Sequence, residues 1–135
     1  MNRIFLGGTR NNSTWRETIE KTVQVSTFNP IVKDWTEKCQ LIERDEKENK
    51  CNIHLYVITS QMTGVFSIAE VIDSVHNKTK KTLLQVIPDG FTKAQLKSLE
   101  AVVDLVNLRG GVAYIDSDIY RTIKILNYAF NYRLL

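Results

Sequence analysis

Three short segments of this 135-residue chain carry residue types suited to binding or cleaving a small molecule. Residues 7–9 form a Gly-Gly-Thr turn, residues 29–35 contain an amide, a carboxylate and a tryptophan, and residues 60–67 lead to Glu70. Glycine lets a ligand approach the backbone, and tryptophan and amide groups can hold a nucleobase or a sugar. These three segments are therefore the candidate ligand-binding loops.

The turn at Gly7, Gly8 and Thr9 leaves two interpretations open. It leads towards a predicted helix, and the amino terminus of a helix favours an anion. The turn contains neither G-x-G-x-x-G nor G-x-x-x-x-G-K-[ST], so a dinucleotide or triphosphate cradle is not supported by motif. The other interpretation is a tight turn whose glycines serve backbone geometry alone.

Glu70 is expected in the first turn of a helix that starts near Ser67. Ser67 and Glu70 have the S-x-x-E spacing of a capping box, in which the glutamate bonds the backbone of its own helix. The alternative is a catalytic carboxylate at the carboxyl edge of the sheet, which the helix dipole keeps ionised and available as a nucleophile.

Asn29, Asp34 and Trp35 follow the end of a predicted strand. They are candidates for contacting a base or a sugar. In the alternative interpretation, Asp34 caps the next helix and Trp35 packs on its first turn. Trp15, at the start of another predicted helix, carries the same ambiguity.

The chain offers few ligands for a metal ion. Its only histidines are His54 and His76, and its two cysteines, Cys39 and Cys51, lack the spacing of a zinc site. His54 falls in a predicted buried strand and is expected to be a satisfied core residue, whereas His76 is expected to be solvated. We expect no metal, no cofactor and the reduced thiols of a cytoplasmic protein.

Short apolar runs alternate with amphipathic stretches along the chain. The expected strands are residues 3–6, 25–28, 53–59, 83–87 and 112–115, and the expected helices are residues 15–23, 36–48, 118–132 and two that begin near residues 67 and 92. This order predicts a three-layer α/β sandwich of the flavodoxin-like or Rossmann-like kind, with a five-stranded, mostly parallel sheet and residues 53–59 at its centre. Capping boxes are expected at Thr14 with Glu17 and at Thr92 with Gln95.

Composition and charge narrow the class of protein. With 43% hydrophobic and 24% charged residues, residues 1–135 are expected to form a single domain. The net charge of +3 comes from interspersed residues, which argues against a nucleic-acid polymer as partner. No stretch has the apolar length of a membrane span. In residues 43–48, Glu43 stands opposite Lys47 and Arg44 opposite Glu48, which predicts a solvated helix face.

Together the three segments resemble the nucleoside 2-deoxyribosyltransferase-like family, in its short branch. The matching pieces are IFLGGT at residues 4–9, Asn-Pro at 29–30 with Asp-Trp at 34–35, and Val-Ile-Thr through Ser-Ile-Ala-Glu-Val at 57–71. The resemblance spans about residues 3–88. It implies N-glycosidic bond chemistry on a small-molecule nucleoside or nucleotide, either deoxyribosyl transfer or hydrolysis.

The resemblance also implies roles for individual residues. In that family, a glutamate in a Gly-Thr-x-x-Glu motif attacks the anomeric carbon and forms a glycosyl-enzyme. By resemblance, Glu70 is this nucleophile and Ser67 stands in the threonine position. The substrate-binding residues are then expected to be Gly7, Gly8, Thr9, Asn29, Asp34, Trp35, Gly64 and Ser67.

Three positions depart from the family's pattern. Gly64 stands where the better characterised transferases have an aspartate, Phe5 where they commonly have a tyrosine, and Phe66 where the motif has glycine. These departures favour hydrolysis, an altered substrate or binding without turnover. Two further interpretations remain: a non-catalytic nucleotide-binding or sensing protein, and an NAD-cleaving domain similar to TIR domains.

The sequence leaves two interpretations of the oligomeric state. Members of the family build their sites at subunit contacts, and residues 128–135 are apolar enough to pack on a neighbour, so a homo-oligomer is expected. The alternative is that this run covers the chain's own sheet.

Overall fold

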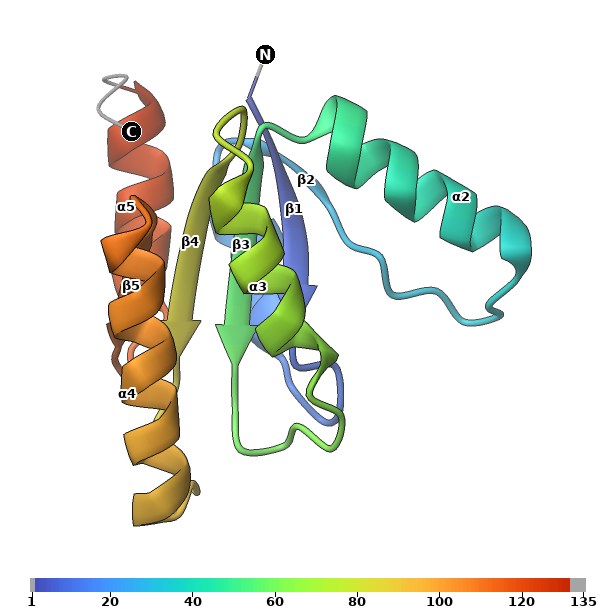
Figure 1. Ribbon diagram of the computed structural model, residues 1–135. Coiled ribbons are helices and arrows are strands. Elements are labelled where there is room, and N and C mark those ends of the chain that lie inside the picture. The colour runs from blue at the N-terminus through green and yellow to red at the C-terminus, as the bar shows by residue number, and fades with distance from the viewer. Residues whose placement is uncertain (1, 132–135) are drawn as a thin grey trace.

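Residues 2–131, which the computed structural model describes, fold around one five-stranded sheet (Figure 1). The strands are β1 (Arg3–Gly8), β2 (Ser26–Phe28), β3 (Ile53–Ile58), β4 (Lys81–Val86) and β5 (Val112–Ile115). The helices are α1 (Trp15–Thr22), α2 (Glu37–Asp45), α3 (Phe66–His76), α4 (Lys93–Leu108) and α5 (Tyr120–Asn131), with a π-helix η1 (Glu46–Lys50) after α2. The strand order is β2-β1-β3-β4-β5 and every neighbouring pair is parallel, so the predicted α/β sandwich is confirmed.

β3 lies at the centre of the sheet, as its apolar run predicts. All six of its residues are buried, because helices cover both faces of the sheet. Side chains alternate along the strand, so Leu55 and Val57 face one layer of helices while Tyr56 and Ile58 face the other. β3 therefore carries the core on both sides of the sheet.

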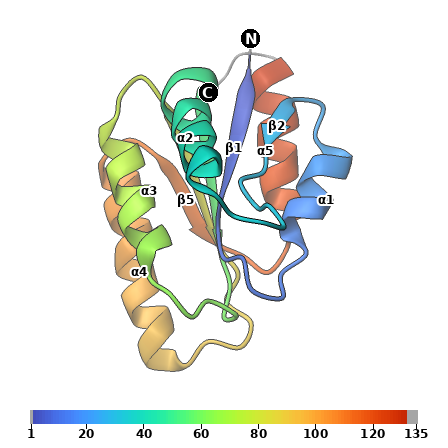
Figure 2. The same ribbon diagram turned by 90° about the vertical axis from the view of Figure 1, so that its right-hand side faces the viewer.

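The helices form two layers that Figure 2 shows on opposite sides of the sheet. α1 and α5 cover one face, where Ile19 and Leu126 pack against the sheet. α3 and α4 cover the other face, where Val71 and Val106 do the same. Each layer supplies only a stripe of apolar side chains, as expected for amphipathic helices on a sheet.

α2 lies outside these two layers and projects away from the sheet beyond β1 (Figure 1). None of its residues is buried, and Leu41 and Ile42 are 64% and 46% exposed. The single helix predicted over residues 36–48 is instead α2 followed by η1. The predicted pairing of Glu43 with Lys47 is wrong, because Lys47 lies in the π-helix and pairs with Glu70.

Helix capping differs between α1 and α4 because their N-cap residues have different backbone conformations. The capping box of Thr92 with Gln95 at α4 is confirmed: both reciprocal hydrogen bonds form, and Thr92 has extended backbone. The box predicted for Thr14 with Glu17 is wrong. Thr14 does stand at the N-cap of α1, but its φ of −112° and ψ of 3° lie outside the extended region, and its side chain makes no capping hydrogen bond.

Two further expectations concern the apolar run at the carboxyl-terminal end and the absence of a membrane span. The apolar run at residues 128–135 lies, beyond residue 131, outside the described part of the chain. Within residues 2–131, no helix combines the length and the apolar character needed to cross a membrane.

Candidate functional site

A cavity of about 300 Å³ opens at the carboxyl ends of β1 and β3. Ligands of parallel α/β sheets bind at this edge. The cavity is lined by six of the nine candidate catalytic and substrate-binding residues: Gly7, Gly8, Thr9, Gly64, Ser67 and Glu70. These six come from two of the three candidate segments, and the third contributes only Pro30.

Hydrogen bonds join the two loops that form the floor of this cavity. The Thr9 hydroxyl oxygen accepts from the Thr59 backbone N–H at 2.9 Å. The Asn11 side-chain amide donates to the Thr63 hydroxyl at 2.9 Å and to the Gln61 carbonyl at 3.3 Å. The loop after β1 is thus tied to the loop after β3.

The prediction of a turn at residues 7–9 is wrong for both glycines, because Gly7 and Gly8 are the last two residues of β1 and pair with Tyr56 and Val57 of β3; packing accounts for both. A Cβ on Gly7 would lie 2.6 Å from the Tyr56 ring, and one on Gly8 would lie 2.1 Å from the Val57 carbonyl oxygen. Gly8 also has a φ of 112°, which disfavours any other residue. The interpretation in which these glycines serve backbone geometry is therefore sufficient to explain them.

The segment at residues 29–35 takes a different course. Asn29 donates to the Glu20 carboxylate and accepts from the Ile31 backbone N–H, which closes a local turn. Asp34 and Trp35 are exposed, and neither they nor Asn29 line the cavity; Pro30 does. The interpretation of Asp34 as a helix cap is wrong: the cap of α2 is the next hydroxyl residue along, Thr36, which accepts from the Cys39 N–H.

Glu70 lies in the cavity wall, one turn into α3. The capping box with Ser67 is not formed, because α3 begins at Phe66 and its N-cap is Val65, whose side chain cannot cap. The Glu70 carboxylate instead accepts a hydrogen bond at Oε2 from the Lys47 ammonium at 2.8 Å. The two side chains are only 14% and 15% exposed, so this ion pair is shielded from water.

Arg16 adds a buried cation to the cavity lining. Its guanidinium donates to the backbone carbonyls of Leu6, Gly8 and Thr9 and lies 4.4 Å from the centre of the Trp15 ring. Burial is the main reason that the pKa of Arg16 is lowered to about 10, so the group stays charged at neutral pH. Trp15 is buried and donates to the Thr9 carbonyl, which makes it a packing residue.

Glu43 brings a second carboxyl group to the cavity from α2. Its pKa is raised, first by burial and then by the negative charge of Glu70, although Arg10, Lys47 and Arg16 oppose the shift. The expectation of a fully solvated helix face is therefore wrong for this residue. The cavity holds two carboxyl groups in different surroundings: Glu70 has an ammonium partner, and Glu43 has a raised pKa.

His54 anchors the segment that carries Lys47. Its Nε2 contacts the Lys47 carbonyl at 2.8 Å, and its Nδ1 contacts the Ser74 hydroxyl at 2.8 Å. A carbonyl only accepts, so Nε2 carries the proton and Nδ1 accepts from Ser74. Ser74 is bonded in turn to Thr82 on β4. The expectation of a satisfied core histidine is confirmed, and the residue also fixes the backbone of η1.

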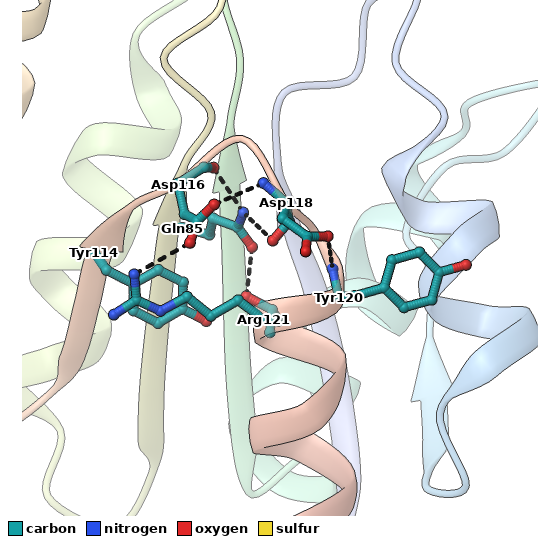
Figure 3. Close-up of polar contacts among 7 residues, drawn as sticks. Gln85, Tyr114, Asp116, Asp118, Tyr120 and Arg121 are labelled. Atoms are coloured by element: carbon teal, nitrogen blue, oxygen red, sulfur yellow. Dashed lines mark hydrogen bonds and ion pairs between the residues drawn. The ribbon is translucent and has the colours of Figure 1, made fainter.

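A second polar cluster lies at the carboxyl ends of β4 and β5 (Figure 3). The Gln85 amide donates to the backbone carbonyls of Asp116 and Asp118 at 2.8 and 3.0 Å. Arg121 stacks on the Tyr114 ring, 4.1 Å from its centre, and pairs with Asp116. These hydrogen bonds and the ion pair hold the loop between β5 and α5 in place.

Sequence reasoning missed Arg16, Glu43 and Lys47. Arg16 is the second residue of the helix that was predicted to follow residues 7–9, and this position could have indicated a residue of the site. The position of Lys47 depends on the π-helix η1, which no pattern in the sequence predicted. Within residues 2–131, no group of three or more His, Cys, Asp or Glu side chains is arranged to hold a metal ion.

No model of a known protein family matches this chain, and no curated protein matches it either.

The buried His54 predicts a loss of stability in mild acid. Burial lowers the pKa of His54 to about 4, against about 6.5 in an unfolded chain, so the unfolded state takes up a proton that the folded state does not. Stability is therefore full above pH 6.5 and falls as the pH drops towards 4. Urea unfolding should show a loss of about 2 kcal/mol between pH 7 and pH 5 from this group.

The matched comparison uses the other histidine. His54→Gln should show a smaller loss over the same pH interval, whereas the exposed His76→Gln should behave as the parent chain does. Equal pH dependence in the parent and in His54→Gln would contradict the assignment.

Proposed function

We propose that this chain breaks the N-glycosidic bond of a nucleoside or nucleotide, by deoxyribosyl transfer or hydrolysis, with Glu70 as the nucleophile. The observation that carries the proposal is the placement of the Glu70 carboxylate in the wall of the cavity at the carboxyl ends of β1 and β3. Among the described residues, its hydrogen bond goes to Oε2, which leaves Oε1 for a substrate. The resemblance to the nucleoside 2-deoxyribosyltransferase-like family supports the same role.

The two carboxyl groups fit the two tasks of glycosyl transfer. Glu70, whose hydrogen bond among the described residues goes to Oε2 alone, can use Oε1 to attack the anomeric carbon C1′ as the bond from C1′ to the base nitrogen breaks. Glu43, with its raised pKa, suits donation of a proton to the departing base. Gly64 leaves the family's aspartate position empty, and Glu43 supplies a carboxyl group from α2 instead.

The charges of the cavity are compatible with a small polar substrate. Arg10, Arg16 and Glu43 line it together with Glu70, and Asn11 adds an amide. We place the reaction in the cytoplasm and take the substrate to be a free nucleoside or nucleotide. Water as the sugar acceptor gives hydrolysis, and a second base gives transfer.

A non-catalytic nucleotide binder is the second candidate. The ion pair between Lys47 and Glu70 favours it, because a carboxylate already paired with an ammonium is a weaker nucleophile. In that case Glu70 would bind the sugar hydroxyls of the ligand without attacking C1′.

Glu70→Gln tests the nucleophile. The change keeps the size of the side chain and removes the negative charge, so release of free base should fall by at least about a hundredfold, in line with the loss of a catalytic nucleophile. The measurement is chromatography of reactions with deoxynucleosides, their 5′-monophosphates and NAD, with and without a free acceptor base.

Exposed Glu37, on α2 and outside the cavity, gives the control Glu37→Gln, which should keep full activity. If the parent chain releases no base from any substrate but is stabilised thermally by one of them, the binder replaces the enzyme.

Glu43→Gln tests the proton donor. It should slow the cleavage of ordinary deoxynucleosides by about a hundredfold, since general acid catalysis contributes on that order. It should leave nearly unchanged the first-turnover release of base from 7-methyl-2′-deoxyguanosine, whose cationic base departs as a neutral molecule without a proton. Equal slowing of both substrates would remove Glu43 from this role.

We also propose a homo-oligomer. Its support is the group of exposed apolar side chains on and before α2, a helix that buries none of its residues: Ile31, Val32, Trp35, Leu41 and Ile42. A second copy that covers this surface would remove apolar area from water. Sedimentation velocity should show a species larger than the monomer that Leu41→Glu dissociates; a monomer at all concentrations would contradict this.

A further inference from the structure

The ion pair between Lys47 and Glu70 has a role beyond holding a helix in place. We propose that Lys47 speeds the second half of the reaction, in which the sugar leaves the Glu70 carboxylate. The inference rests on the function proposed above for Glu70. Lys47 acts through Glu70, so it is a positioning residue.

The contact has the geometry of a strong charge-assisted hydrogen bond. The Lys47 ammonium lies 2.8 Å from Glu70 Oε2, and the two side chains are only 15% and 14% exposed to solvent. The same ammonium lies 5.6 Å from the centre of the Phe5 ring, so its other side faces an aromatic surface. Shielding makes this pair stronger than an exposed pair of the same length.

The position of Lys47 is fixed by its backbone as well as by its charge. The residue belongs to the π-helix η1, a rare form of helix that is frequent at functional sites. Its carbonyl accepts from His54, which is 2% exposed, and the preceding Glu46 is buried and pairs with Arg3 at 2.7 Å. The lysine therefore reaches Glu70 from an anchored segment.

The charge on Glu70 changes in opposite directions during the two steps. In the first, Oε1 forms a bond to C1′ while the electron pair of the C1′–N bond moves to the base nitrogen, which takes a proton from Glu43. In the second, water attacks C1′ and gives a proton back to Glu43, and the C1′–Oε1 electron pair returns to the carboxylate. Negative charge is lost from Glu70 in the first step and restored in the second.

An ammonium at Oε2 stabilises the carboxylate and not the neutral ester. It therefore opposes the formation of the glycosyl ester and assists its breakdown, because only interactions that strengthen towards the transition state accelerate a step. Without this ammonium, the second step should become rate-limiting and the glycosyl-enzyme should accumulate.

Lys47→Met tests this directly, because it keeps most of the side chain's length and removes its charge. With the deoxynucleoside that the parent chain cleaves best, the variant should show a burst of one equivalent of base followed by turnover reduced about tenfold or more. Intact-protein mass spectrometry should show an adduct of one deoxyribosyl group. Lys47→Arg should restore turnover and remove the adduct.

Lys50→Met is the matched control, since Lys50 belongs to the same π-helix but is 61% exposed and pairs with Asp45. It should behave as the parent chain does. Lys47→Gln serves as a second uncharged variant if Lys47→Met does not fold, as judged by circular dichroism.

The outcomes separate this inference from the function on which it rests. If the parent chain releases no base, both fail. If the parent chain turns over but the uncharged variants show neither burst nor adduct, only the role of Lys47 is overturned. A burst with an adduct that Lys47→Arg abolishes supports both.

Discussion

The close parallel pairing of β1 with β3 is the constraint on which the rest of the site depends. Gly8 lies directly beside Val57, where any Cβ would meet the neighbouring backbone, and the Thr9 N–H donates to the Val57 carbonyl just beyond the strand. This contact carries the register of the strands into the loops that follow. Two loops fifty residues apart therefore share one floor, and the cavity opens above it.

The charged groups around that floor are tolerated because each has compensation of its own. Arg16 binds three backbone carbonyls at and just beyond the end of β1, so the buried cation has hydrogen-bond acceptors. Glu70 has the Lys47 ammonium. Burial and, after it, the negative charge of Glu70 raise the pKa of Glu43, and the charges of Arg10, Lys47 and Arg16 oppose this shift.

The fold could be predicted from the sequence far better than the site. An apolar run such as residues 53–59 predicts a buried central strand, because such a run is favourable only where helices cover both faces of the sheet. The strand Val112–Ile115 was predicted with its observed bounds. The Ser67–Glu70 spacing was misleading, since a capping box needs extended backbone at a hydroxyl N-cap and the N-cap of α3 is Val65, two residues before Ser67. Lys47 was assigned to solvent because an α-helical spacing was assumed where the chain forms a π-helix. Local spacing cannot reveal such contacts, which join residues 23 positions apart.

The two walls of the cavity differ in how firmly they are held. α3 and the loops after β1 and β3 rest on the core, whereas α2 buries no residue. Its continuation η1 is tied to the sheet by Arg3 with Glu46 and by His54 with the Lys47 carbonyl, and to α3 by Lys47 with Glu70. Segments with few buried apolar contacts open most readily. Lys47 stands at the anchored end of this segment and Glu43 on its loosely packed part. In the proposed reaction, Glu70, held by the fixed end, would define the position of the sugar, and Glu43, on the part that can adjust, would adapt to the base.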